Sequence, residues 1–116
     1  MVIVNLNKYQ ILLKTVELGS ITRAAEALGY TQSAVSRVIA DLEREWDMEL
    51  LTRSRTGVVL SSSGAALLPY VQAVCNAGRE LEEQERLTKE RLQVLDNTIR
   101  WLRKDGNLMN YEVTLK

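Results

Sequence analysis

The 116-residue chain contains no histidine and no phenylalanine, and it has a single cysteine and a single proline. Without histidine, the chain lacks the side chain that proteins use most often as a general base and as a metal ligand. One cysteine, Cys75, cannot form an internal disulfide or a cysteine zinc cluster. A glycine-rich phosphate loop is missing as well. We therefore expect a protein without catalytic residues, metal ligands or a bound cofactor.

Long hydrophobic runs are also missing, so no segment is predicted to span a membrane. The opening residues, MVIVNLNK, are too few for a signal peptide. We expect a cytoplasmic protein with no membrane partner. Hydrophobic residues make up 46% of the chain and aromatic residues only 5%, which indicates a modest core of Leu, Ile, Val and Ala side chains between helices.

Charge is balanced overall but segregated along the chain. Fifteen basic residues match fifteen acidic ones, so the chain is not a general polycation. Residues 41–49 hold five acidic side chains and one base, whereas the rest of residues 1–60 holds six bases and two acids. Clustered carboxylates are compatible with acid–base or metal chemistry, but we favour a solvated helix face for residues 41–49.

The first thirty residues predict two short amphipathic helices. Residues 6–18 have apolar side chains at helical spacing, and residues 22–29 have a side of small alanines. Gly19 and Gly29 end the two helices, because glycine readily adopts the left-handed conformation that follows a helix end. Leu6, Tyr9, Leu13 and Val16 form the expected buried side of the first helix. The candidate helix caps are Asn5 or Asn7 for the first helix and Ser20 or Thr22 for the second.

A third helix is predicted over residues 32–46, with Thr31 as its cap. Its apolar side chains fall on one stripe that ties the helix to its neighbours: Val35, Val38, Ile39, Leu42 and Trp46. The opposite side of its first turns carries Gln32, Ser33, Ser36, Arg37 and Ala40. This polar side, which carries one base and no acid, is left facing outward.

The next segment predicts a small β-hairpin. Two apolar runs, Leu50-Leu51 and residues 58–60, flank the turn-forming SRTG of residues 54–57. Arg53 and Arg55 make this hairpin basic. Residues 61–63 are all serine and can cap a following helix.

A long helix is predicted over residues 62–104. Apolar residues recur there at alternating steps of three and four for about five heptads, which is typical of a helix that pairs along a narrow seam. The middle of the seam is weak, because it contains Gly78, Glu85 and Thr88. The expected dimerisation residues are Leu67, Val71, Val74, Leu81, Leu92, Leu95, Ile99 and Leu102.

The beginning of this seam has a second interpretation. Leu67, Val71, Val74 and Leu81 could pack on the preceding domain of the same chain instead of on a partner. We favour pairing, because an exposed apolar stripe of that length would promote unspecific association. Cys75 is expected to be a small buried hydrophobic side chain on the same helix.

Helix, short turn, helix and hairpin is the order of a winged helix-turn-helix. We therefore expect a mainly α fold with three helices and a two-stranded wing in residues 1–61, a long dimerisation helix in residues 62–104, and a tail in residues 105–116 whose alternation would suit a short strand. In such a fold the third helix enters the DNA major groove, where Gln32 can read adenine and Arg37 guanine. The same helix spacing also occurs in helical cores with no nucleic-acid role.

Over residues 6–70 the chain resembles the N-terminal DNA-binding domain of LysR-type transcriptional regulators. The resemblance is carried by GSITRAAEALGYTQSAVSRVIADLE (residues 19–43) and ELLTRSRTGVVLSSSGAALLPY (residues 49–70). It implies sequence-specific binding of double-stranded DNA by a homodimer that pairs through the helix after the wing, with scope for higher assembly. The DNA-binding residues expected from this resemblance and from the charge pattern are Arg23, Thr31, Gln32, Ser33, Ser36, Arg37, Arg53 and Arg55.

The chain also departs from that family. Asp47 stands where glycine is usual, and because Asp adopts left-handed backbone geometry less readily, we expect an altered exit from the third helix. The family's effector domain has no counterpart here, so no inducer site is expected within the chain, which is either a fragment or a shortened relative. An alternative function is a protein-interaction module that pairs through the long helix with a full-length relative.

Overall fold

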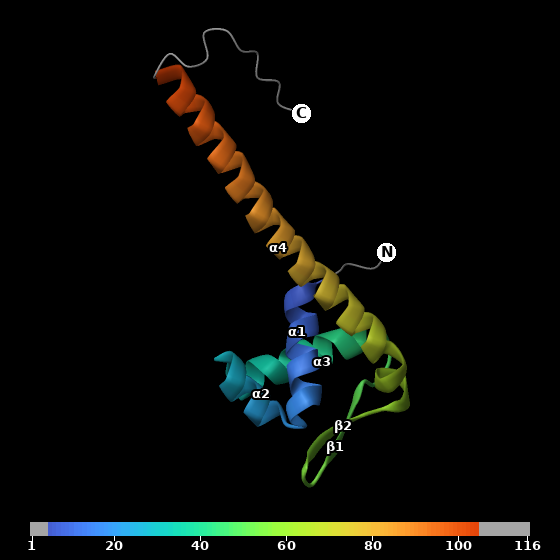
Figure 1. Ribbon diagram of the computed structural model, residues 1–116. Helices are drawn as coiled ribbons and strands as arrows, with labels where there is room; N and C mark the ends of the chain where they lie inside the picture. The colour runs from blue at the N-terminus through green and yellow to red at the C-terminus, as the bar shows by residue number, and fades with distance from the viewer. Residues whose placement is uncertain (1–4, 105–116) are drawn as a thin grey trace. The chain divides into compact units, whose positions relative to one another are not determined.

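The computed structural model describes residues 5–104 of the chain (Figure 1). The mainly α, winged helix-turn-helix fold predicted from the sequence is confirmed, and the strand expected in residues 105–116 lies outside the described residues. The elements in chain order are helix α1 (Leu6–Leu18), helix α2 (Ile21–Leu28), helix α3 (Gln32–Glu45), strand β1 (Leu51–Ser54), strand β2 (Gly57–Leu60) and helix α4 (Ser62–Lys104).

Each of the first three helices begins at a polar side chain that binds its own first turn. The side-chain oxygens of Asn5, Ser20 and Thr31 accept hydrogen bonds from backbone N–H groups three residues on, at 3.2, 3.1 and 3.1 Å. These bonds satisfy amides that no helical carbonyl can reach. Gly19 and Gly29 follow α1 and α2 with φ values of 63° and 74°, the left-handed geometry expected of them.

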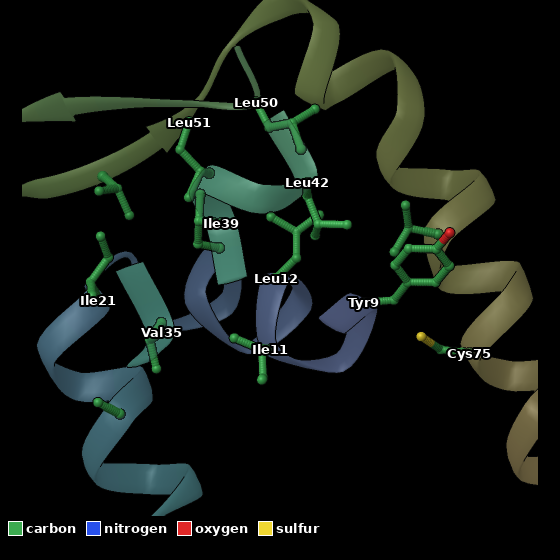
Figure 2. Close-up of a cluster of buried hydrophobic side chains, with 13 residues drawn as sticks. Tyr9, Ile11, Leu12, Ile21, Val35, Ile39, Leu42, Leu50, Leu51 and Cys75 are labelled. Carbon is green, nitrogen blue, oxygen red and sulfur yellow. The ribbon is translucent and has the colours of Figure 1, made fainter. Parts of the chain in front are cut away.

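The core lies where α1, α2 and α3 meet the wing. Val35, Ile39 and Leu42 of α3 are buried as predicted, and Figure 2 shows Leu42 beside Leu12 of α1. Tyr9 of α1 is buried as expected, and Leu6, Leu13 and Val16 are partly buried against the core. The buried side also includes Ile11, Leu12 and Thr15, which were not expected there. Several elements pack on α1, so its buried arc is wider than a single stripe.

The first part of α4 belongs to the compact unit that carries the wing. This unit, here called the winged unit, ends at Gly78, so it extends past the expected boundary at residue 61 into the long helix. The reason is packing: Val71 and Cys75 of α4 are buried in the core cluster, and Cys75 lies across from Tyr9 in Figure 2. Gly78 lies close to Leu6, since a Cβ added to this glycine would be 2.6 Å from a methyl carbon of that leucine.

The second unit begins at Arg79, and its described part is helical to Lys104. We call this stretch the distal helix. Side chains on its neighbouring turns form ion pairs: Arg86 with Glu83 at 2.6 Å and Glu90 at 2.7 Å, and Lys89 with Glu85 at 2.7 Å. Pairs three or four residues apart lie on one face of a helix and stabilise it modestly.

Candidate nucleic-acid interface

The polar side of α3 faces solvent. Gln32, Ser33 and Arg37 are exposed and Ser36 is half-buried, while the apolar stripe of the same helix fills the core. Thr31 is exposed as well, and its hydroxyl oxygen accepts the backbone N–H of Ala34. The arrangement offers amide, hydroxyl and guanidinium groups from one short helical turn.

A shallow groove joins α3 to the wing. It is lined by Gln32, Ser33, Ser36, Arg37 and Ala40 of α3, together with Arg53 of β1. The strand register explains how Arg53 reaches this place. Successive side chains of a strand point to opposite faces, so Arg53 shares the inner face of β1 with buried Leu51. The long arginine side chain leaves that face at its edge, beside the helix.

The two other predicted arginines lie elsewhere. Arg55 is exposed in the two-residue turn of the wing, and Arg23 is exposed on α2. Neither lines the groove of α3. The structure therefore gathers Gln32, Ser33, Ser36, Arg37 and Arg53 and leaves the remaining two cations at separate points of the surface.

Acidic side chains lie on the other side of Arg53. A second open concavity is lined by Glu43, Asp47 and Glu49 together with Arg53 and apolar neighbours. Arg53 thus stands at the border between a groove without carboxylates and a surface that carries several. A polyanion is attracted to the first and repelled by the second, so the charges favour one orientation of approach.

Glu43 has a structural task that the sequence did not reveal. Its carboxylate is half-buried and accepts the backbone N–H of Leu50 at 2.7 Å, which ties α3 to the start of the wing. Residues 41–49 are therefore not uniformly a solvated helix face. The signal available in the sequence was a carboxylate seven residues before an apolar strand, which is too common to be read in advance.

The exit from α3 keeps the left-handed turn, so the altered exit expected from Asp47 is not seen. Asp47 has φ of 49°, and the backbone N–H groups of Met48 and Asp47 donate to the carbonyls of Glu43 and Arg44 at 3.0 and 3.3 Å. This pair of hydrogen bonds is typical of a helix end at which the residue after the cap is left-handed. The chain keeps the turn and accepts the strain of a non-glycine residue there.

The predicted dimerisation residues fall into two groups. Val71 is buried in the core of the winged unit, and Leu67 and Val74 pack against that core, as the second interpretation of the seam anticipated. Leu81, Leu92 and Leu95 are exposed, and Ile99 and Leu102 are half-buried.

Within residues 5–104, no group of three or more acidic, cysteine or histidine side chains is placed to hold a metal ion. No helix in this range is both long enough and apolar enough to cross a bilayer. What the site offers is a groove of hydrogen-bonding groups with two guanidinium groups.

Solved structures with this fold include DNA complexes. The BenM DNA-binding domain in complex with catB site 1 DNA aligns with a TM-score of 0.65 and 27% identity, covering 73% of this chain and 97% of that one. The CbnR DNA-binding domain, also in a DNA complex, aligns with a TM-score of 0.68 and 22% identity, covering 73% of this chain and 98% of that one.

Sequence comparison leads in the same direction. The transcriptional regulator SoxR of Arthrobacter sp. (strain TE1826) is 44% identical over 72 residues, which is 62% of this chain and 25% of that protein. The chain thus spans about a quarter of the length of this curated relative. Residues 6–65, more than half of the chain, match the family model described as "Bacterial regulatory helix-turn-helix protein, lysR family", and the chain therefore belongs to that family.

Proposed function

We propose that this chain binds double-stranded DNA sequence-specifically, as a homodimer, and thereby regulates transcription. The observation that carries the proposal is the single groove that combines the outward side of α3 with Arg53 of the wing. Membership of the lysR family supports DNA-binding transcription regulation, and the relatives described above are regulators rather than enzymes. A cytoplasmic location, where bacterial DNA is found, goes with this proposal.

The chemistry of the groove suits base recognition. An α-helix fits the major groove, and the residues of its first turns reach the base edges. Gln32 is suited to adenine and Arg37 to guanine, because each can form two hydrogen bonds to the matching base. Ser33 and Ser36 are short and can donate or accept at close range. The structures of the BenM and CbnR domains with DNA support this use of the fold.

The other exposed cations are assigned to the phosphate backbone. Arg53 leaves the wing beside α3, Arg55 lies at the tip of the hairpin, and Arg23 lies on the helix before the turn. Thr31 adds the amide end of α3, which favours an anion. Contacts of this kind position a protein on the duplex and make its affinity fall with salt.

Homodimerisation is assigned to α4. The distal helix keeps apolar side chains at heptad positions, with Leu92, Leu95, Ile99 and Leu102 in series. Such a series pairs two helices, and two paired subunits would present two recognition helices to half-sites about one turn of DNA apart, or a multiple of that.

The base-reading role of Arg37 can be tested by substitution. Arg37→Ala should weaken binding to a preferred duplex by roughly 1–3 kcal/mol and relax one base position. Arg53→Ala should weaken preferred and random duplexes alike and reduce the salt dependence. Arg44→Ala is the matched control, because Arg44 is exposed on the same helix but pairs with Asp41 and lies outside the groove.

The measurement is a fluorescence titration against a duplex enriched from a random library by the unaltered chain, and against a shuffled duplex. An equal loss on both duplexes for Arg37→Ala would contradict base reading by Arg37. A loss for Arg44→Ala as large as that for Arg37→Ala would contradict the placement of the interface in the groove.

A further inference from the structure

The wing contacts the turn between α1 and α2 through a backbone hydrogen bond. The N–H of Val58 donates to the carbonyl oxygen of Gly19 at 3.0 Å. The residue before it, Gly57, has φ of 140°, and a Cβ built there would lie 2.1 Å from the same oxygen. A side chain at position 57 therefore cannot coexist with this contact, whatever rotamer it takes.

The contact holds the strand position directly opposite Arg53. In the antiparallel register of the wing, Val58 pairs with Arg53 and Gly57 pairs with Ser54. Opposite residues of an antiparallel pair lie on the same face of the sheet, so the inward burial of Val58 and the direction of Arg53 are coupled. The base of the wing is closed separately, since the N–H of Ser61 donates to the carbonyl of Leu50 at 2.9 Å.

We propose that Gly19 and Gly57 form a backbone latch that positions the wing, and that its task is to aim Arg53 at the groove beside α3. Gly57 is then a positioning residue that acts through Arg53. The inference rests on the proposed function, because the position of Arg53 matters only if this residue contacts DNA. The latch itself is a property of the free protein.

The first test concerns the free protein. In the full chain, Gly57→Ala should expose the Val58 amide, so that its hydrogen exchange accelerates at least tenfold while amides of α1 and α3 keep their protection. Gly29→Ala is the matched control. It also places alanine at a positive φ, 74°, but a Cβ there meets nothing within 4 Å. This control shows what alanine at a positive φ costs when no steric clash accompanies it.

The second test is a double-mutant cycle on DNA, with a duplex of roughly 30 base pairs enriched from a random library by the unaltered chain, long enough for two half-sites. Arg53→Ala should reduce affinity about tenfold in the unaltered chain and in Gly29→Ala, as expected for loss of a charged hydrogen bond. In Gly57→Ala, the further change Arg53→Ala should reduce affinity less than about twofold, because the arginine is already misplaced.

Coupling between positions 57 and 53 together with fast exchange at Val58 supports the inference. An equal tenfold loss from Arg53→Ala in the Gly57→Ala background overturns it, as does unchanged Val58 exchange in that variant. If the unaltered chain selects no duplex, the proposed function and the aiming role fail together, and the Val58 exchange then decides only whether the latch exists.

Discussion

The two parts of α4 carry the same seven-residue pattern but have different surroundings. Up to Gly78, Val71 and Cys75 are buried in the core of the winged unit, and their neighbours belong to the same chain. From Arg79 on, Leu81 is 70% exposed and Leu92 61% exposed. A heptad pattern thus shows that one side of a helix is to be covered, and it does not show which molecule covers it.

The carboxylates of the two units also differ in what they bind. In the winged unit the Glu43 carboxylate accepts the backbone amides of Leu50 and Leu51 at the start of the wing, so it is part of the tertiary structure. In the distal helix Glu83 and Glu85 pair with Arg86 and Lys89 on neighbouring turns of their own helix. The distal helix is therefore stabilised locally along its length, and its apolar residues remain available for a partner.

The sharpest way to break this comparison is to place the same charge at a seam residue of each part. Val71→Asp should destabilise the winged unit by roughly 3–5 kcal/mol, because an unpaired carboxylate would replace a core side chain. Leu81→Asp, at an exposed position, should change the free energy of unfolding by less than about 0.5 kcal/mol. Urea unfolding followed by circular dichroism, at a protein concentration too low for self-association, measures both.

Sedimentation of the same two variants completes this test. Leu81→Asp should leave the fold intact and weaken self-association, as expected for a seam that faces a partner. Equal destabilisation by the two substitutions would show that the exposed seam is covered within the chain, against the comparison drawn here.

A second test compares carboxylates. Glu43→Ala should destabilise the protein by about 1–3 kcal/mol, since the Leu50 N–H loses its acceptor in a part-buried place. Glu85→Ala should leave the urea midpoint almost unchanged, because it removes one exposed ion pair. The two variants are compared by their urea midpoints, and similar midpoints would contradict the structural task of Glu43.

A smaller effect of opposite sign is expected at Asp47. Asp47→Gly should stabilise the winged unit by about 0.5–1 kcal/mol, because glycine adopts the left-handed conformation of this position without steric cost. Thermal unfolding of this variant should therefore begin at a higher temperature. A lower melting temperature would mean that the Asp47 side chain contributes more than its backbone strain removes.

The smallest expected effect is a change of stability at low pH. The hydrogen bond and charge of Arg86 lower the pKa of Glu83 below its ordinary value of 4.5. The stabilisation from this pair is therefore complete above pH 4.5 and is lost as the pH falls through the lowered pKa. In Arg86→Gln, the NMR titration of the Glu83 carboxyl should move upward toward 4.5, and an unmoved titration would show that the pair does not persist in solution.

Much of the fold was predictable because its signals are local. A capping side chain, an apolar stripe and a terminal glycine lie within one helix, and for α3 the cap Thr31 and the buried residues Val35, Ile39 and Leu42 agree with the structure. The hairpin was equally readable, because its turn and its two apolar runs are adjacent in sequence.

The remaining features depend on contacts between distant segments. Thr15 is fully buried on α1 because its hydroxyl donates to the Ile11 carbonyl at 2.8 Å, and a helical stripe that counts only apolar residues passes over it. The approach of Arg53 to α3 and the contact between Gly57 and Gly19 arise only once the wing has packed on the domain. The roles assigned to the predicted DNA-binding residues stay predictions.

Cys75 gives the winged unit an internal reporter. It is the only thiol of the chain, and 1% of its surface is exposed in the core beneath α4. A thiol reagent can therefore react with Cys75 only when the protein opens. When the protein recloses faster than the reagent reacts, the labelling rate reports the free energy of opening. The variants of the winged unit can be ranked by that rate, at protein concentrations far too low for pairing.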